Sequence, residues 1–417
     1  MPPVIPSPAL REPGNGLPQG AFGKLRLSDL APNLVQSEIR AMTVACAEAG
    51  AINLAQGVCD TDPPHPVVAA AVAAIHSGQN IYTRLDGIAP LREAIAHKLS
   101  RPGHPPLDPQ SEVLVTSGAT GALHAALLAL LNAGDECVVL EPFYGYHVST
   151  LRAMRAVPVI VPLANSAQGP WFALDVDRLR RALTPQTRAI LLNSPSNPSG
   201  KVFSLSELEA IAAIAIERDL FVFTDEIYEH FVYDGTRHIS IRTLCGMAER
   251  TITISGFSKT FSVTGWRLGY LVASQRWLPA IGYFHDLIYV CAPSPLQHGA
   301  AAGLLELPES FYAQIAHEHQ AKRDRLCQSL AHAGLEASVP SGAYYVLANA
   351  ERIAGVNARA KARRLLTDAG VAAVAGSAFF AEDANGTNPG ENLLRFCFAK
   401  KDEDLAEACK RLEAYHP

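Results

Sequence analysis

The sequence predicts an α/β fold with a large domain, built on a mostly parallel central sheet sandwiched by helices, and a smaller α+β domain. Between residues 65 and 300, short apolar runs alternate with longer amphipathic runs, which is the pattern of strands and helices in turn. After residue 300 this alternation ends, and a long charged helical segment precedes two short strands. A chain of 417 residues is long enough for two domains, each with a core of its own.

The strands expected in the large domain are short apolar runs. They cover residues 112–116, 137–140, 158–162, 188–193, 220–224, 251–255 and 268–273. Helices are expected at 120–131 and 205–218. Strands separated by helices of this length need crossover connections, which predict a buried and mostly parallel sheet. In the second domain the pattern predicts a helix at 308–333, strands at 343–347 and 393–398, and a closing helix from Asp402.

The domain boundaries follow from these changes in pattern. Residues 1–24 are rich in Pro and Gly and are predicted to form a mobile or extended arm. Residues 25–64 are assigned to the N-terminal part of the small domain and 65–300 to the large domain. Residues 301–417 then form the C-terminal part of the small domain.

Composition and charge exclude several classes of protein. Hydrophobic residues make up 48% of the chain and charged residues 18%, which is too apolar for a disordered protein. The net charge is −5 with both signs interspersed, so no nucleic-acid or membrane partner is expected. The eight cysteines include no CxxC pair, as in a reduced cytoplasmic protein without a zinc site or disulfide framework. His317 and His319 point to different faces of a charged helix and are predicted to be solvated, so no metal site is expected.

Polar segments follow several predicted strands, at the sheet edge where parallel sheets bind ligands. The small-residue turn Thr116-Ser117-Gly118-Ala119-Thr120-Gly121 lies between a strand and a helix. Free N–H groups and the helix dipole make such a turn an anion site, although any tight turn needs the same small residues. The segment from Asn193 to Gly200 is not a nucleotide-binding loop, because Pro195 and Val202 stand where that loop has Gly and Ser or Thr. A Pro-rich turn is the simpler interpretation, but it leaves the two flanking amides unexplained.

Two further segments carry ionisable groups. Asp225 follows an apolar strand, three residues before Tyr228, where a helix N-cap is the simpler interpretation. Lys259 follows the next strand among apolar and small residues. It is either a surface charge or, beside a second cation at Arg267, an amine with a lowered pKa that can act as a nucleophile. Arg267 has the planar guanidinium that suits a phosphate.

Taken together, these segments resemble the class I/II aminotransferases of the pyridoxal-5′-phosphate (PLP) fold-type I superfamily. The resemblance covers about residues 28 to 410 and rests on the order of several motifs, none of which is specific alone. The motifs are Tyr82, Ser117-Gly118-Ala119-Thr120, Tyr144, Asn197-Pro198-Ser199-Gly200, Asp225-Glu226-Ile227-Tyr228, Ser258-Lys259, Gly265-Trp266-Arg267 and Arg395.

The resemblance implies a binding site for PLP. Lys259 matches the lysine that holds PLP as a Schiff base and then moves a proton during the reaction. Asp225 matches the carboxylate that faces the pyridine nitrogen, while Tyr228 and Asn197 match the donors to the phenolate oxygen of the ring. Tyr144 matches the aromatic residue that stacks on the cofactor. The residues that match the phosphate cradle are Gly118, Ala119, Thr120, Ser258 and Arg267.

The resemblance also implies how substrates and a second subunit take part. Arg395 matches the arginine that grips the substrate α-carboxylate, with Gly57 and Asn197 as further substrate contacts. Tyr82 matches a tyrosine that reaches the phosphate from the neighbouring subunit, so a homodimer with shared active sites is expected. The segment after Gly57 and the residue Phe380 depart from the family pattern, and no second arginine is evident for a distal carboxylate. Neutral, aromatic or sulfur-containing amino acids are therefore favoured over aspartate.

Three functions fit the resemblance. The leading one is transamination between an L-amino acid and a 2-oxo acid in two half-reactions. The alternative on the same fold is a PLP-dependent lyase or cyclase that acts by elimination, C–S lysis or cyclisation. A non-catalytic protein that binds a ligand for regulation is disfavoured, because Lys259, Asp225, Arg267 and Arg395 are all present and the first 24 residues are too few for a DNA-binding domain.

Overall fold

The computed structural model describes residues 27–28, 30, 38–100, 105–164 and 171–417. The chain divides into two compact units, Met1–Gln36 and Ser37–Pro417. The arm predicted at residues 1–24 lies outside the described residues. Every helix and strand of the described residues belongs to the second unit.

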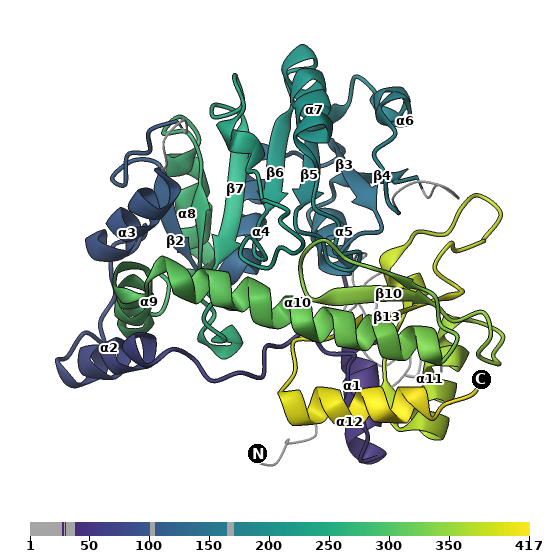
Figure 1. The fold of residues 1–417 in the computed structure, drawn as a ribbon. Coiled ribbons are helices and arrows are strands. Elements are labelled where there is room, and N and C mark those ends of the chain that lie inside the picture. The colour runs from purple at the N-terminus through teal and green to yellow at the C-terminus, as the bar shows by residue number, and fades with distance from the viewer. Residues whose placement is uncertain (1–26, 29, 31–37, 101–104, 165–170) are drawn as a thin grey trace, which may run out of the picture. The chain divides into compact units, whose positions relative to one another are not determined.

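A seven-stranded sheet forms the centre of this unit (Figure 1). In sheet order its strands are β2 (Val113–Thr116), β8 (Gly269–Val272), β7 (Thr251–Gly256), β6 (Phe221–Asp225), β5 (Thr187–Asn193), β3 (Glu136–Glu141) and β4 (Val157–Pro162). Strand β8 runs antiparallel to both of its neighbours, and all other neighbouring pairs are parallel. The prediction of a mostly parallel central sheet is confirmed.

The strands are apolar on both faces because helices cover the sheet from two sides. In β3, Val139 packs in the hydrophobic cluster that contains α4 (Gly118–Leu130), whereas the next residue, Leu140, packs in the cluster that contains α7 (Leu205–Glu217). Helix α7 begins with a capping box, in which the Ser204 hydroxyl accepts the Glu207 N–H and the Glu207 carboxylate accepts the Ser204 N–H. Two-sided burial explains why these strands are continuous apolar runs in the sequence.

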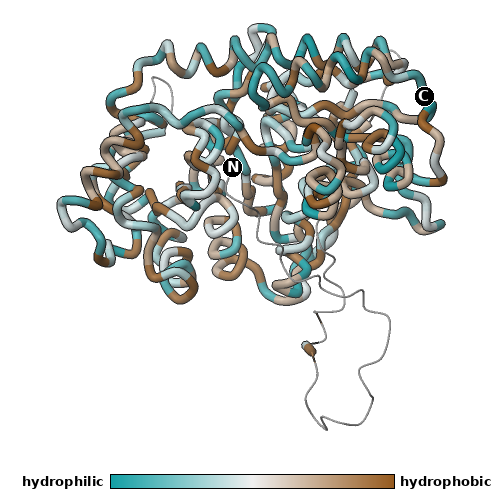
Figure 2. The backbone as a smooth tube through the Cα atoms, turned by 90° about the horizontal axis from the view of Figure 1, so that it is seen from below, coloured by the Kyte–Doolittle hydropathy of each residue, from teal (hydrophilic) through white to brown (hydrophobic). Residues whose placement is uncertain are grey.

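The remaining helices surround the sheets. They are α1 (Glu38–Glu48), α2 (His65–His76), α3 (Ala89–Leu99), α5 (Gly145–Ala153), α6 (Val176–Ala182), α8 (Leu278–Tyr289), α9 (Ser294–Glu306), α10 (Glu309–His332), α11 (Ala358–Ala369) and α12 (Asp402–Glu413), with short 3₁₀ turns η2 (Ile241–Thr243), η3 (Thr264–Trp266) and η4 (Gly376–Phe379). The long α10 crosses the front of the unit in Figure 1 and contacts α12. In Figure 2 the outer helices alternate between hydrophilic and hydrophobic segments, as expected for helices with one buried face.

Two smaller sheets make up the rest of the unit. A four-stranded antiparallel sheet has the order β12 (Val374–Ala375), β13 (Leu393–Cys397), β10 (Tyr345–Asn349) and β9 (Ala337–Ser338). A two-stranded parallel sheet joins β1 (Ile52–Asn53) to β11 (Val371–Ala372). The smaller α+β part is therefore confirmed, while its boundaries at residues 64/65 and 300/301 stay predictions.

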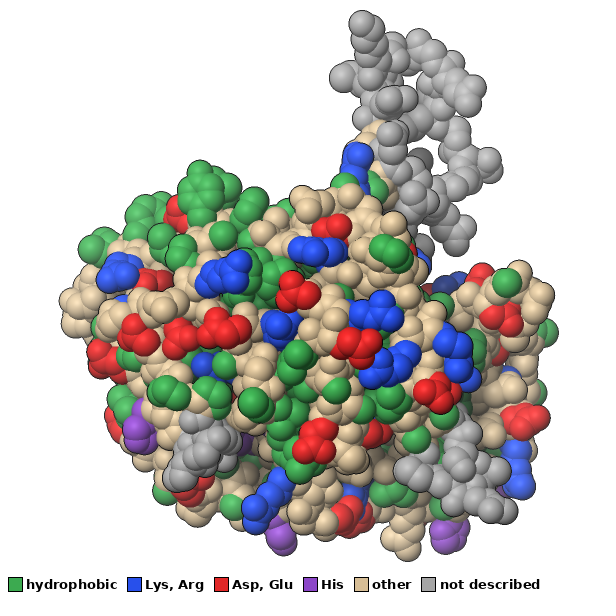
Figure 3. Space-filling view, turned by 90° about the horizontal axis from the view of Figure 1, so that it is seen from above, with side chains coloured by type: hydrophobic (Ala, Val, Ile, Leu, Met, Phe, Trp, Pro, Cys, Tyr) green, Lys and Arg blue, Asp and Glu red, His purple; other side chains and the backbone are tan. Residues whose placement is uncertain are grey.

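The surface carries charges of both signs. Figure 3 shows Lys and Arg side chains interspersed with Asp and Glu over the face seen from above. This agrees with a chain whose net charge is only −5. Among the described residues, no helix has the length and apolar character needed to cross a membrane.

The prediction that both histidines of α10 are solvated is wrong for one of them. His317 is exposed, but His319 is buried, with its Nδ1 2.9 Å from the Ile315 carbonyl oxygen. The ring of His319 also packs edge-on against Phe231, with ring centres 4.9 Å apart. Residues at i and i+2 lie on different faces of a helix, so one of the two histidines faces the core.

Candidate active site

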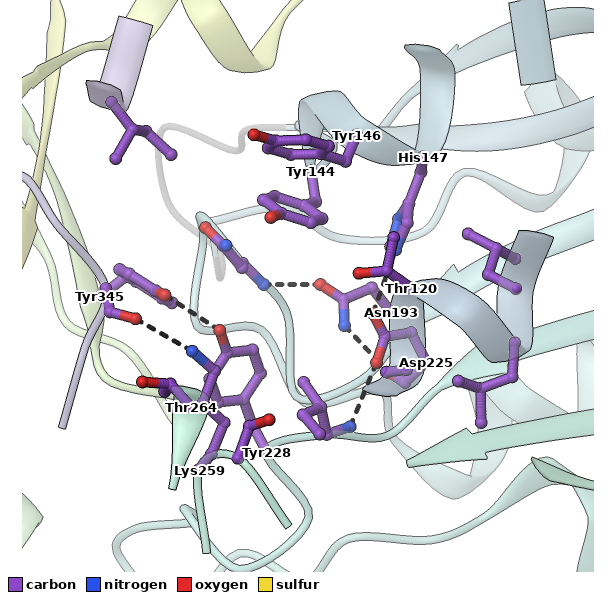
Figure 4. A pocket seen from close by; sticks show the side chains of 18 of the residues that line it. Thr120, Tyr144, Tyr146, His147, Asn193, Asp225, Tyr228, Lys259, Thr264 and Tyr345 are labelled. Atoms are coloured by element: carbon purple, nitrogen blue, oxygen red, sulfur yellow. Dashed lines mark hydrogen bonds and ion pairs between the residues drawn. The ribbon is translucent and has the colours of Figure 1, made fainter. Parts of the chain in front are cut away.

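A cavity of about 280 Å³ opens at the carboxyl ends of the central strands (Figure 4). Its walls include the ends of β5 and β6, the N-terminal turns of α4 and α5, and residues of α1, β10 and β13. This is the edge of the sheet at which a parallel α/β fold binds its ligands. The polar segments that follow the predicted strands therefore meet in one place.

Asp225 ends β6 and is held by groups from neighbouring elements. Its Oδ2 is 3.0 Å from Nε2 of His147, which projects from α5. Its Oδ1 accepts the Ile227 N–H at 3.2 Å, and Asn193 at the end of β5 donates to its backbone carbonyl at 2.9 Å. Turns rather than a helix follow Asp225, so the N-cap interpretation is wrong. The carboxylate is held at the wall of the cavity instead.

Lys259 follows β7 and lies half-buried at the cavity rather than exposed on the surface. Its Nζ donates to the Gly57 carbonyl oxygen at 2.9 Å and lies 6.0 Å from the ring centre of Tyr228. Burial is the largest influence on the pKa of Lys259 and lowers it from the ordinary value; the Arg267 guanidinium adds to this effect. A buried amine with a lowered pKa loses its proton more readily and becomes a better nucleophile.

Tyr345 reaches the same cavity from β10. Its hydroxyl is 2.9 Å from the hydroxyl of Tyr228. A Cβ atom at Gly57 would overlap the Tyr345 hydroxyl, so only glycine fits where this backbone passes. Burial raises the pKa of Tyr228 well above its ordinary value, so this phenol stays protonated and can donate a hydrogen bond.

Arg395, in β13, is fully buried beside these tyrosines. Its Nη1 donates to Oδ1 of Asn197 at 3.0 Å, and its Nη2 donates to the Ala55 carbonyl. The guanidinium carbon lies 4.4 Å from the ring centre of Tyr345 and 4.8 Å from that of Phe379. The Nε donor is buried without a hydrogen-bond partner among the described residues. A buried cation with an unused donor is suited to a carboxylate ligand.

The turn at the start of α4 and the Arg267 guanidinium form an end of the site rich in N–H donors. Gly118 has a φ of 73°, and a Cβ there would lie 2.8 Å from Nη2 of Arg267, so the guanidinium packs against the turn. Ala119 and Thr120 lie in the first turn of α4, whose N–H groups have no partner within the helix. Such a helix N-terminus next to an arginine is suited to a phosphate.

Comparison with known proteins decides the family, because residues 49–412 match the family described as aminotransferase class I and II. The chain belongs to the class I and II aminotransferases. A probable N-succinyldiaminopimelate aminotransferase from Mycobacterium tuberculosis is 38% identical over 375 residues, which cover 89% of this chain and 94% of the relative.

Solved structures agree with this family assignment. The N-succinyldiaminopimelate aminotransferase of M. tuberculosis superposes with a TM-score of 0.88 at 38% identity, covering 94% of this aminotransferase and 100% of that chain. An Escherichia coli protein identified with a methionine aminotransferase function superposes with a TM-score of 0.87 at 30% identity, with coverage of 94% and 100%. The predicted family, fold type and PLP-dependent transfer of an amino group from an amino acid to a 2-oxo acid are confirmed.

The donor set of the cavity fits PLP. A buried amine, a carboxylate, phenol and amide donors and an anion-binding turn line one space. Eleven predicted site residues line it, namely Gly57, Ala119, Thr120, Tyr144, Asn197, Asp225, Tyr228, Ser258, Lys259, Arg267 and Arg395. Gly118 lies in the same turn as Ala119. Tyr82, which the prediction assigns to a second subunit, is 78% exposed and is not among the lining residues.

Sequence reasoning missed several residues that line the cavity, among them His147, Asn193, Tyr345 and Arg40. His147 lies three residues after Tyr144, and Asn193 is one of the two amides that flank the Pro-rich turn. Tyr345 lies within the strand predicted at residues 343–347, and its side chain lines the cavity. Arg40, on α1, lines the cavity in addition to Arg267 and Arg395, and no motif in the sequence reveals it.

Proposed function

We propose that Lys259 holds PLP covalently in this cavity and that its amine moves the proton that leaves the substrate Cα. The observation that carries the proposal is the convergence of Lys259, Asp225 and Arg395 on one cavity. When bound, PLP supplies an electron sink for the bond that breaks at Cα. The buried position of Lys259 supports its role, because a lowered pKa makes the unprotonated amine available.

Asp225 faces the pyridine nitrogen in this proposal. An ionised carboxylate favours the protonated form of that nitrogen, which strengthens the electron sink. His147 and Asn193 act as positioning residues, because their hydrogen bonds hold Asp225 in place. Tyr144 stacks on the ring.

The donors to the ring oxygen are Tyr228 and Asn197. Tyr228 is a protonated phenol at the cavity wall. Asn197 uses its Oδ1 for Arg395, which leaves its Nδ2 donor for the cofactor. Together the two donors favour the ionised form of the ring oxygen.

The turn before α4 would hold the phosphate. Gly118, Ala119 and Thr120 offer backbone N–H groups there, and Ser258 and Arg267 add side-chain donors. Arg267 is exposed and uses its Nη1 for the Thr264 carbonyl at 3.0 Å, so its other donors are free for an anion.

Arg395 binds the substrate α-carboxylate, together with the backbone of Gly57 and the amide of Asn197. The N–H groups of Arg395 that Asn197 and Ala55 do not use support this role. Bidentate binding fixes the orientation of the amino acid, so that its Cα–H bond lies within reach of Lys259.

The side-chain end of the site is bounded by Ile39, Val58, Tyr146 and Arg40. The apolar members support neutral, aromatic or sulfur-containing amino donors. Among the Lys and Arg side chains that line the cavity, Arg40 alone makes no hydrogen bond or ion pair with a described residue. Because Arg40 is exposed, it stays hydrated when a neutral donor is bound and can pair with the distal carboxylate of an acidic 2-oxo acid.

A homodimer completes the site in this proposal. Large hydrophobic side chains are exposed on α8 and on the segment 81–85, namely Ile81, Tyr82, Leu85, Tyr283, Leu287 and Ile288. The two segments touch, since a Cβ at Gly282 would lie 2.9 Å from Cδ1 of Leu85. An apolar surface of this kind suits a second copy of the chain, and Tyr82 then reaches the partner's phosphate site. Mixing Tyr82→Ala and Lys259→Ala chains should restore activity through hybrid dimers; no restoration would contradict the shared site.

The cellular location remains part of the proposal. All eight cysteines are free thiols, with no disulfide among them. This supports a reducing compartment such as the cytoplasm.

A half-reaction tests the proposed function. The PLP-loaded enzyme is mixed with an amino acid and no 2-oxo acid, and products are counted per active site. Transamination predicts one equivalent of 2-oxo acid, after which the reaction stops until an acceptor is added. Continuous release of ammonia, thiol or a cyclised product would instead indicate a lyase or cyclase.

A further inference from the structure

His285, on α8, accepts a hydrogen bond from the turn that begins α4. The Ser117 N–H donates to Nε2 of His285 at 3.0 Å. The imidazole is completely buried and does not line the cavity. It therefore contacts the turn without lining the cavity.

The imidazole is neutral at ordinary pH. Burial lowers the pKa of His285 to about 4, so Nε2 keeps its lone pair and the proton resides on Nδ1. That Nδ1 is buried and makes no hydrogen bond with a described residue. An unpaired buried donor costs free energy, and phenylalanine would fill a similar volume without this cost. Packing alone therefore does not explain a histidine here, whereas acceptance of the Ser117 N–H does.

The bond matters because the residue after Ser117 is a glycine. Gly118 adopts a φ of 73° and, without a side chain, permits many backbone conformations. Ser117 makes no side-chain cap of α4, so its side chain does not hold the turn. Strand β2 fixes the residue before the turn, since Thr116 pairs with Gly269 of β8. The hydrogen bond to His285 then fixes the Ser117 N–H, so the backbone that leads into the flexible Gly118 has a defined orientation.

Helix α8 also contacts α4 one turn further on. A Cβ at Gly121 would lie 3.2 Å from Cε2 of Tyr289, and the rings of Tyr289 and His285 have centres 5.1 Å apart. Two consecutive turns of α8 thus support the first turn of α4. Ala119 and Thr120 belong to this first turn and line the cavity, so the direction of their N–H groups depends on this support.

We propose that His285 is a positioning residue for the phosphate-binding turn and sets the affinity of the enzyme for the phosphate group of PLP. It does so by accepting the Ser117 N–H, which directs that donor away from the ligand and holds the following N–H groups toward it. The inference rests on the proposed assignment of the phosphate to this turn.

The test compares two ligands that differ only in the phosphate. Dissociation constants for PLP and for pyridoxal are measured on the apoenzyme of the native chain and of His285→Phe and His285→Gln. Phenylalanine removes the acceptor, whereas glutamine places its amide oxygen near the position of Nε2. His298→Phe is the matched control, because His298 on α9 also has a buried ring nitrogen without a hydrogen-bond partner among the described residues but does not line the cavity.

For His285→Phe we expect PLP binding weakened about tenfold, the effect of about one hydrogen bond, with pyridoxal binding within about twofold of native. His285→Gln should retain most of the native preference for PLP, and His298→Phe all of it. The inference would be overturned if His285→Phe weakened the binding of both ligands equally, or if it kept the native preference for PLP over pyridoxal. If His285→Phe does not fold, His285→Asn serves instead, because its amide is too short to reach Ser117.

The same data separate this inference from the proposed function. If the native apoenzyme binds PLP and pyridoxal equally, the phosphate assignment itself is wrong. If the native enzyme prefers PLP and His285→Phe keeps that preference, only the role of His285 is wrong.

Discussion

Replacing Arg395 by lysine should weaken amino-acid binding and leave PLP binding nearly unchanged. Lysine keeps the positive charge, so the substitution removes the geometry of the guanidinium rather than its charge. In the native enzyme Nη1 donates to Asn197 and Nη2 donates to the Ala55 carbonyl. The guanidinium packs against the rings of Tyr345 and Phe379, and each Nη has a second N–H that can serve a substrate carboxylate.

The size of the effect can be worked out by counting donors. A guanidinium has five N–H groups and an ammonium has three. If the lysine ammonium satisfies Asn197 and Ala55, one donor is left for the carboxylate, which an arginine can hold with two parallel bonds. The loss of one hydrogen bond to a charged group is worth about 1.5–3 kcal/mol, or roughly a 10- to 150-fold increase in the dissociation constant.

The assay is the half-reaction without a 2-oxo acid, in which the rate against amino-acid concentration gives an apparent dissociation constant. PLP affinity is measured separately by titration of the apoenzyme. Arg323→Lys is the control, since Arg323 is buried and paired with Asp234 but does not line the cavity. It should lower stability without changing amino-acid binding. Equal weakening of PLP and amino acid in Arg395→Lys, or no weakening of either, would refute the reasoning.

Four further predictions concern the cofactor and the acceptor. Lys259→Ala should abolish covalent attachment of PLP after borohydride reduction, as seen by mass spectrometry; a label on another lysine would show the assignment to be wrong. In the apoenzyme, acylation of Lys259 should rise with pH to a midpoint below the value of about 10.4 for a free lysine, because burial lowers its pKa, and a midpoint at or above that value would contradict the burial argument. His147→Phe should slow the half-reaction about 10- to 100-fold, because Asp225 loses a charge-assisted hydrogen bond, and an unchanged rate would count against that role. Arg40→Ala should raise the KM for 2-oxoglutarate about tenfold and leave that for pyruvate within about twofold; a parallel change in both would exclude a distal contact.

The part of the site that sequence reasoning predicted lies at strand ends. Asp225 is the last residue of β6 and Lys259 lies three residues after the end of β7, and the carboxyl ends of parallel strands meet at one edge of a sheet. The order of the strands in the sheet is not needed for that inference, because every such end faces the same edge. The residues proposed to bind the cofactor could therefore be predicted from the periodicity of the sequence together with the family resemblance.

The residues that were missed depend on how helices and the second sheet pack. Arg40 belongs to a helix near the start of the chain, and Tyr345 to an antiparallel strand of the smaller sheet. Neither position follows from local pattern, since each depends on how its element packs against the large sheet. The start of β10 was also predicted two residues early, because Ala343 adopts a positive φ of 55° and does not continue the strand.

The pairing of β1 with β11 has a consequence for the way the chain acquires its site. Ile52 pairs with Val371, near the other end of the sequence, and this pairing precedes Ala55 and Gly57, which contact Arg395 and Lys259. During synthesis the central sheet can assemble as its strands emerge from the ribosome, but β1 has to wait for β11. We therefore expect the wall proposed to hold the substrate carboxylate to be among the last parts to form, after the central sheet.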